Sequence, residues 1–318
     1  MMNTTEELVN RILDGDRLAL ARAITVVENE SPGHREIVKA AYRHSGRAYV
    51  VGVTGSPGTG KSTLTDGLID AARNEGKKVG VIAVDPTSPF TGGAILGDRI
   101  RMQTRSIDPD VFIRSLATRG HLGGLSRATG ATLHLLDAFG CDVIFIETVG
   151  TGQSEVEIMR YAHTVVVVAA PGMGDDVQAM KAGIMEIGDV FAVNKADREG
   201  AGRTALEIEY MLDMSPPGRG WRPPVVKTVA VSGEGIALLA SKISEHAAYV
   251  RQSGEMQKHA LQASEFDVSE VLAQAVVEPL IEKSKARGLW DDVISKVASR
   301  ELDPYTAVDI LIESRKTE

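Results

Sequence analysis

The spacing of apolar residues changes twice along the chain and divides it into three regions. Up to about residue 46, apolar residues recur at helical spacing with charged residues between them. The series is Leu8, Ile12, Leu18, Leu20, Ala23, Ile24 and Val27. Ser31-Pro32-Gly33 interrupts it, and a further helix is expected over His34–Arg43. The first region is therefore predicted to be helical.

The middle region, residues 47–254, alternates short apolar runs with helical stretches. Most runs are continuous in Val and Ile, as expected for strands buried on both faces of a largely parallel sheet. The predicted strands are Tyr49–Val53, Val79–Val84, Val111–Ile113, Val143–Ile146, Val165–Ala169, Val190–Val193 and Val225–Val231.

The last region, residues 255–318, is predicted to be helical again. Its expected helices are Val268–Lys285, Leu289–Arg300 and Tyr305–Glu313. Gly254 and Gly288 are either short linkers or ordinary helix ends.

Composition narrows the class of protein. The 35 Lys and Arg residues against 43 Asp and Glu give a formal charge of −8, which argues against a broad nucleic-acid surface. Cys141 is the single cysteine, so no internal disulfide or CxxC pair is expected. The start is acidic where a secretory signal would be basic, and the apolar run Val165–Ala170 is too short for a bilayer. We therefore expect a soluble cytoplasmic protein without membrane contact.

A phosphate-binding motif follows the first predicted strand. Gly55, Ser56, Pro57, Gly58, Thr59, Gly60, Lys61 and Ser62 match G-x-x-x-x-G-K-[ST], with Thr63 and a helical pattern next. Backbone N–H groups of such a loop and of the following helix N-terminus hold phosphate oxygens. Lys61 is expected to reach the β- and γ-phosphates, and the Ser62 hydroxyl to bind Mg²⁺.

A second motif indicates which base is bound. Asn194, Lys195 and Asp197 form N-K-x-D directly after the strand ending at Val193. An aspartate there can accept hydrogen bonds from guanine N1–H and the 2-amino group, whereas adenine would leave the carboxylate unpaired. Ser232, Gly233 and Glu234 are expected to cover the base. Together these residues predict GTP and GDP rather than ATP.

Further acidic residues are candidates for the metal and for catalysis. Asp85 and Glu147 each follow an apolar strand, and Asp98 lies in the long loop after the second strand. Mg²⁺ prefers such oxygen ligands, so Ser62, Asp85, Asp98 and Glu147 form the predicted set. Gly150 is expected to sense the γ-phosphate, so Lys61, Glu147 and Gly150 are the predicted catalytic residues.

The residue after this glycine predicts the rate of hydrolysis. Small regulatory GTPases place a water-orienting glutamine there, whereas this chain has Thr151, and its nearest glutamine is Gln153. We therefore expect slow GTP hydrolysis that a partner accelerates.

With these motifs in place, the chain resembles the MeaB/ArgK family of P-loop GTPases over nearly its whole length. The resemblance includes Leu18–Ile24, the phosphate loop, Val84–Pro89, Gly97–Met102, Arg119–Leu125 and Glu147–Glu155. It implies an α/β P-loop NTPase fold with a mostly parallel central sheet, an N-terminal helical extension (1–46), a GTPase domain (47–254) and a C-terminal helical dimerisation arm (255–318).

The resemblance also implies a function. Members of this family are chaperones that gate adenosylcobalamin loading and protect methylmalonyl-CoA mutase, so a homodimer serving such an acyl-CoA mutase is expected. The family's partner-signalling loop corresponds here to Pro171–Lys181, which makes Asp175, Gln178 and Lys181 candidates for signalling. By position alone, these residues also suit a glycine-rich loop that opens a helix.

Two alternatives share parts of this pattern. A metal-delivery GTPase of the nickel-enzyme type would need a Cys/His entry site, and the histidines are scattered. A kinase acting on a transport protein would need an acceptor site that no motif indicates.

Overall fold

The fold is taken from a computed structural model that describes residues 4–85, 108–117, 128–148, 160–172, 184–214 and 220–316. All seven predicted strands are present and pair in parallel in one sheet, in the order β3-β2-β4-β1-β5-β6-β7. The strands are β1 Tyr49–Thr54, β2 Val79–Asp85, β3 Val111–Ala117, β4 Val143–Thr148, β5 Thr164–Ala169, β6 Val190–Val193 and β7 Val225–Lys227. The predicted α/β fold with a mostly parallel central sheet is confirmed.

The last strand is shorter than predicted. It ends at Lys227, whereas the apolar pattern extended it to Val231. Val229 instead forms an isolated antiparallel bridge with Glu234, and the Val231 side chain is 86% exposed. The chain turns back on itself here, because Gly233 and Gly235 adopt positive φ angles of 78° and 77°.

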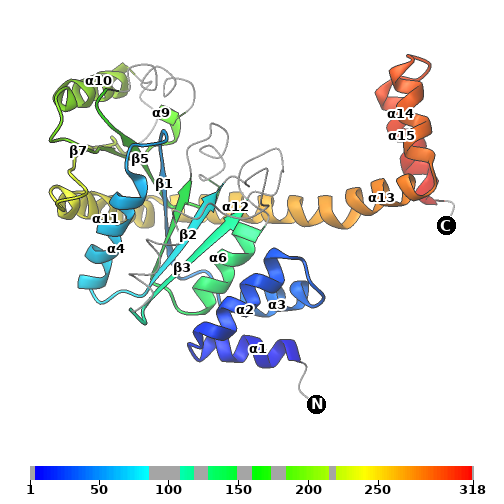
Figure 1. The fold of residues 1–318 in the computed structure, drawn as a ribbon, viewed down its shortest axis with the longest axis horizontal. Coiled ribbons are helices and arrows are strands. Elements are labelled where there is room, and N and C mark those ends of the chain that lie inside the picture. The colour runs from blue at the N-terminus through cyan, green and yellow to red at the C-terminus, as the bar shows by residue number, and fades with distance from the viewer. Residues whose placement is uncertain are drawn as a thin grey trace. The chain divides into compact units, whose positions relative to one another are not determined.

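Each strand contributes side chains to both faces of the sheet, which explains why its apolar runs are continuous. Along β1, Val50 belongs to one buried cluster while Val51 and Val53 belong to the other. One face is covered by α4 (Lys61–Asn74) and α11 (Ile236–Ser253). The other is covered by the N-terminal helices with α6 (Ala128–Ala138) and α10 (Ala201–Met214), and Figure 1 shows α6 beside these N-terminal helices. The short helix α9 (Ile184–Ile187) precedes β6.

The N-terminal region forms three helices: α1 (Thr4–Leu13), α2 (Arg17–Glu28) and α3 (His34–Tyr42). Most of the predicted apolar series is buried, including Ile12, Leu20 and Ile24. Leu8 is partly buried, and Leu18 is exposed at 78%. It lies two residues before Leu20, which on a helix turns its side chain to the opposite, solvent-facing side.

The C-terminal region is helical almost throughout. It contains α12 (Glu255–Leu272), a π-helical segment (Ala273–Val277), α13 (Glu278–Ala286), α14 (Leu289–Ala298) and α15 (Pro304–Lys316). Gly254 and Gly288 adopt left-handed conformations at helix ends. Of the two interpretations that the sequence left open, both glycines are therefore ordinary helix ends rather than linkers.

Contacts divide the chain into two compact units, residues 1–260 and 261–318. In the second unit, α13, α14 and α15 pack on one another and bury Val293, Ala307 and Leu311. None of the described helices combines the length and apolar character needed to span a bilayer.

Candidate nucleotide site

The phosphate loop lies between the carboxyl end of β1 and the first turn of α4. Gly55, Gly58 and Gly60 all have positive φ angles, of 138°, 79° and 89°. A Cβ atom on Gly55 would lie 2.1 Å from the Val168 carbonyl oxygen. The loop is therefore held against β5, and its close approach requires glycine.

Lys61 lies inside this loop rather than in solvent. Its side chain is buried, and its ammonium donates hydrogen bonds to the carbonyl oxygens of Gly55 (2.6 Å) and Ser56 (3.0 Å). The Thr59 hydroxyl also donates to the Ser56 carbonyl (2.9 Å). The loop thus holds the Lys61 ammonium at its own centre, where the cation can neutralise a phosphate group.

The next residue meets the predicted metal ligand of β4. The Ser62 hydroxyl, in the first turn of α4, donates a hydrogen bond to Oε1 of Glu147. Behind this pair, the Thr148 hydroxyl donates to the Thr54 hydroxyl at 3.0 Å, and both threonines are fully buried. A hydroxyl and a carboxylate that converge at one sheet edge are hard oxygen donors, so these residues fit Mg²⁺.

The base motif is built onto the phosphate loop. Asn194 is buried, and its amide Nδ2 donates to the Thr59 carbonyl at 2.8 Å. Its Oδ1 accepts from the Thr228 hydroxyl (3.2 Å) and the Ala230 N–H (3.0 Å). Asn194 therefore joins the phosphate loop to the loop after β7.

Lys195, which follows β6, makes a second contact with the phosphate loop. It adopts a positive φ of 58°, and its ammonium donates to the Gly58 carbonyl at 2.6 Å. Asp197 follows in an exposed turn, where its carboxylate is accessible to a base. The predicted recognition residues thus lie at the same edge of the sheet as the phosphate loop.

The loop after β7 carries the residues predicted to cover the base. Ser232, Gly233 and Glu234 form an exposed turn closed by the Val229 N–H bond to the Glu234 carbonyl (3.0 Å). Gly235 ends the turn. A Cβ atom there would lie 2.2 Å from the Lys227 carbonyl oxygen, so this position requires glycine. α11 begins immediately afterwards.

Several supporting residues were not predicted. Thr54, Thr148 and Thr228 are buried polar residues in or beside apolar strands, and they hold the loops through their hydroxyls. The sequence feature that could have indicated them is a threonine at the carboxyl end of an otherwise apolar run. Their partners could not be read from that signal, because each lies on another strand or loop.

Some predicted residues lie outside the part that the structure describes. These are Asp98, Gly150, Asp175, Gln178 and Lys181, together with the side chain of Asp85, whose backbone ends β2. Among the described residues, no group of three His, Cys, Asp or Glu side chains is arranged to hold a metal ion. Cys141 is buried, and burial raises the pKa of its thiol to about 12.

Comparison with known proteins agrees with this arrangement. The sequence profile of the family described as methylmalonyl-CoA mutase-associated GTPase MeaB matches residues 20–285. A putative GTPase of Pyrococcus abyssi is 52% identical over 97% of this chain and 96% of its own. The GTPase ArgK of Escherichia coli is 33% identical over 99% of this chain and 98% of its own.

A solved structure supports the fold over the same extent. The crystal structure described as a LAO/AO transport system kinase superposes with a TM-score of 0.74, at 27% identity and 99% coverage of both chains. The family profile covers most of the chain, and the relatives are named GTPases. The chain therefore belongs to the MeaB/ArgK family and is a P-loop GTPase that hydrolyses GTP.

Proposed function

We propose that this GTPase is a chaperone of an adenosylcobalamin-dependent acyl-CoA mutase, with methylmalonyl-CoA mutase as the expected client. It gates cofactor loading and protects or reactivates the mutase, and it acts as a homodimer through residues 255–318. The observation that carries this proposal is the match over residues 20–285 to a family described by its association with methylmalonyl-CoA mutase.

Nucleotide binding follows from the loops described above. Residues 55–63 surround the phosphates, with Lys61 neutralising charge on the β- and γ-phosphates. Asn194 and Lys195 hold the base loop against the phosphate loop, and Asp197 accepts the guanine donors. Ser232, Gly233 and Glu234 cover the base from the other side.

Mg²⁺ would be held by Ser62 and Glu147, with Asp85 and Asp98 as further ligands. When bound, the ion neutralises charge that develops on the phosphate oxygens. The Ser62–Glu147 contact holds a hydroxyl and a carboxylate close together at the end of the phosphate loop. Gly150 senses the γ-phosphate, and Asp175, Gln178 and Lys181 transmit the nucleotide state to the client.

The proposal is tested by GTP turnover of the full chain, alone and with an adenosylcobalamin-dependent methylmalonyl-CoA mutase. Slow turnover that the mutase accelerates supports the chaperone role, since Thr151 replaces the water-orienting glutamine. Turnover that the mutase leaves unchanged contradicts it. Glu147→Gln and Ser62→Ala should each lower Mg²⁺-dependent turnover, whereas Glu207→Gln on the exposed face of α10 serves as the control.

Base selection is tested separately by Asp197→Asn. An asparagine amide complements xanthine, which carries a carbonyl where guanine has its 2-amino group, so this variant should lose GTP and gain XTP affinity. Loss of a charged hydrogen-bond partner predicts a decrease of roughly tenfold or more for GTP. Asp213→Asn, at an exposed ion pair with Arg222, should leave the preference for GTP intact. Equal competition by GTP and ATP in the parent would refute the base assignment.

A further inference from the structure

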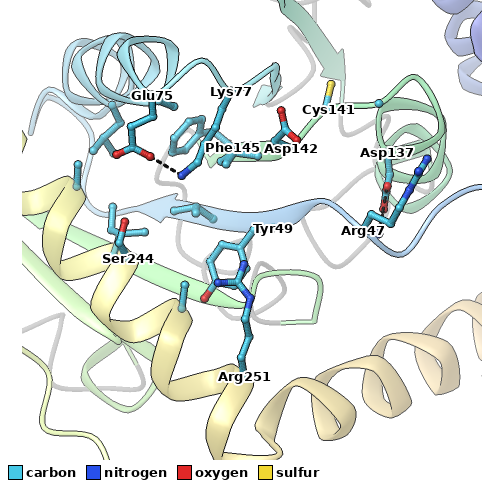
Figure 2. Close-up of a pocket in the computed structure, with 18 residues that line it drawn as sticks. Arg47, Tyr49, Glu75, Lys77, Asp137, Cys141, Asp142, Phe145, Ser244 and Arg251 are labelled. Atoms are coloured by element: carbon cyan, nitrogen blue, oxygen red, sulfur yellow. Dashed lines mark hydrogen bonds and ion pairs between the residues drawn. The ribbon is translucent and has the colours of Figure 1, made fainter. Parts of the chain in front are cut away.

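A cavity of about 520 Å³ lies at the amino-terminal edge of the sheet. The nucleotide site lies at the opposite edge, because the phosphate loop follows the carboxyl end of β1. Figure 2 shows this cavity, with β1 behind it and α11 along one side. Small-molecule sites typically enclose about 300–1,000 Å³, so its volume suits a small ligand.

Part of the cavity lining is apolar, and the rest is polar or charged. The apolar part is lined by Leu68 and Ala72 of α4, by Ile243 and Ala247 of α11, and by Phe145 of β4. All five residues are buried and belong to the same core cluster. The alanines leave space between the two helices, and no large side chain of the described residues fills it.

Most charged groups at the cavity already have partners within the protein. Lys77 pairs with Glu75 at 2.6 Å. The Asp137 carboxylate accepts the Gly46 N–H at 2.6 Å, and the Asp142 carboxylate accepts the Lys78 N–H at 2.8 Å.

The two arginines that line the cavity differ in whether their guanidinium groups have hydrogen-bond partners. Arg47 donates to the His44 carbonyl at 3.3 Å. Figure 2 shows Arg251 beside the ring of Tyr49. Its guanidinium carbon lies 5.2 Å from the ring centroid. Within the described ranges, its guanidinium makes no hydrogen bond or ion pair, so one cation beside an aromatic ring remains for a ligand.

We propose that this cavity is a second ligand site, for a small amphipathic carboxylate. The apolar body of the ligand lies between α4 and α11, and its carboxylate pairs with Arg251. A guanidinium binds a carboxylate through two parallel N–H···O bonds, which selects an anionic ligand over a neutral one of the same shape. The site binds its ligand independently of the nucleotide, since none of its residues belongs to the phosphate or base loops.

The test is isothermal titration of the full chain with sodium octanoate, with GDP and Mg²⁺ at saturation so that the phosphate loop is filled. Octanoate should bind saturably at one site per chain. 1-Octanol, which has the same chain length and no charge, should bind more weakly. Absence of saturable octanoate binding overturns the proposal.

Variants separate the two parts of the site. Ala247→Trp fills the apolar part of the cavity and should abolish octanoate binding. Arg251→Gln removes the guanidinium charge without filling the apolar part of the cavity, so it should weaken octanoate binding roughly tenfold while leaving 1-octanol unchanged. Arg203→Gln, which removes an exposed charge on α10, is the matched control and should change neither.

Two outcomes overturn the assignment of the site. One is octanoate binding that persists in Ala247→Trp, and the other is binding that Arg251→Gln does not weaken. GDP affinity reports whether each variant is folded. If Ala247→Trp no longer binds GDP, Ala240→Leu fills the same cavity with a smaller side chain and replaces it in the comparison.

Discussion

At the scale of single residues, Asn194 joins the two halves of the nucleotide site. Its amide contacts Thr59, which is 135 positions away in the sequence, and the Thr228 hydroxyl and Ala230 N–H on the far side. A buried amide with its hydrogen bonds satisfied fixes the position of both loops, and its loss would leave buried backbone groups unpaired.

Gly60 is constrained by this same amide. A Cβ atom on Gly60 would lie 2.5 Å from Asn194 Nδ2, whereas one on Gly58 would have nothing within 4 Å. Both glycines have positive φ, so alanine at either position costs about 1–2 kcal/mol of backbone strain. Gly60→Ala should reduce the free energy of unfolding by a further ~1–3 kcal/mol, because it displaces the Asn194 hydrogen bond.

The measurement is urea denaturation of the nucleotide-free protein, with Gly58→Ala as the matched variant. The difference between the two variants isolates the contact from the backbone strain. Equal destabilisation by the two substitutions would show that Asn194 does not brace the loop.

His163 predicts a pH dependence of stability. Its Nδ1 accepts the Val50 N–H at 2.9 Å, which requires an unprotonated ring nitrogen. Burial, together with the nearby charges of His259 and Arg251, lowers its pKa from 6.5 to about 4. As the pH falls, the unfolded chain therefore binds a proton at His163 before the folded chain does. The contribution of neutral His163 to the free energy of unfolding is complete above pH 6.5 and is lost as the pH falls toward 4.

This shift corresponds to roughly 3 kcal/mol of the free energy of unfolding. His163→Gln removes the titrating group, so its stability should fall less steeply than that of the parent between pH 6.5 and 4. Denaturation at several pH values measures the slope, with the exposed residue His44 replaced by Gln as the control. Parallel curves for the parent and His163→Gln would contradict the assignment.

At the scale of elements, α4 and α11 connect the nucleotide loops to the core. α4 begins at the phosphate loop and α11 begins after the base-covering turn. They pack on the same sheet face, and Gly67 of α4 lies against Ile236, the first residue of α11. A Cβ atom on Gly67 would meet three Ile236 side-chain atoms at 3.1–3.2 Å, so glycine permits this close packing.

Gly67→Leu should therefore destabilise the protein by about 1–3 kcal/mol through overpacking. Ile236→Ala creates space at the same contact, and the double variant should recover part of that loss. Thermal unfolding of the parent, both single variants and the double variant gives the interaction energy. If the destabilisation of the double variant equalled the sum of the two single variants, Gly67 and Ile236 would not be in energetically significant contact.

At the scale of the whole molecule, the C-terminal unit leaves apolar side chains uncovered. Leu261 and Val268 are each 67% exposed, and Leu272 is 59% exposed. Their spacing of seven and four residues places them on one side of α12. Exposed apolar groups in such a stripe are typical of a surface covered by another chain, which supports the proposed homodimer.

Val268→Glu with Leu272→Glu should convert a dimer into monomers, because it places charges in the apolar contact. Gln262→Glu with Ser269→Glu adds the same charge at exposed polar positions of α12 and should leave the dimer intact. Light scattering coupled to size-exclusion chromatography measures the mass. A parent chain that is already monomeric at micromolar concentration would refute the proposed dimer.

The sequence alone was sufficient for the fold class and for the place of the phosphate and base motifs at the ends of their strands. Strand runs such as Val165–Ala169 are apolar because they are buried on both faces, so pattern and structure share one cause. The phosphate motif was readable because its glycines meet local requirements for positive φ and close approach.

Tertiary structure decided what depends on contacts between distant residues. The pairing of Asn194 with Thr59, the burial of Lys61 in its own loop and the end of β7 at Lys227 all follow from how strands and loops meet. The cavity beside Arg251 arises in the same way, from two helices that lie on the same face of the sheet and line it with small residues. Periodicity reports which face of an element is buried, but it does not report which partner that face meets.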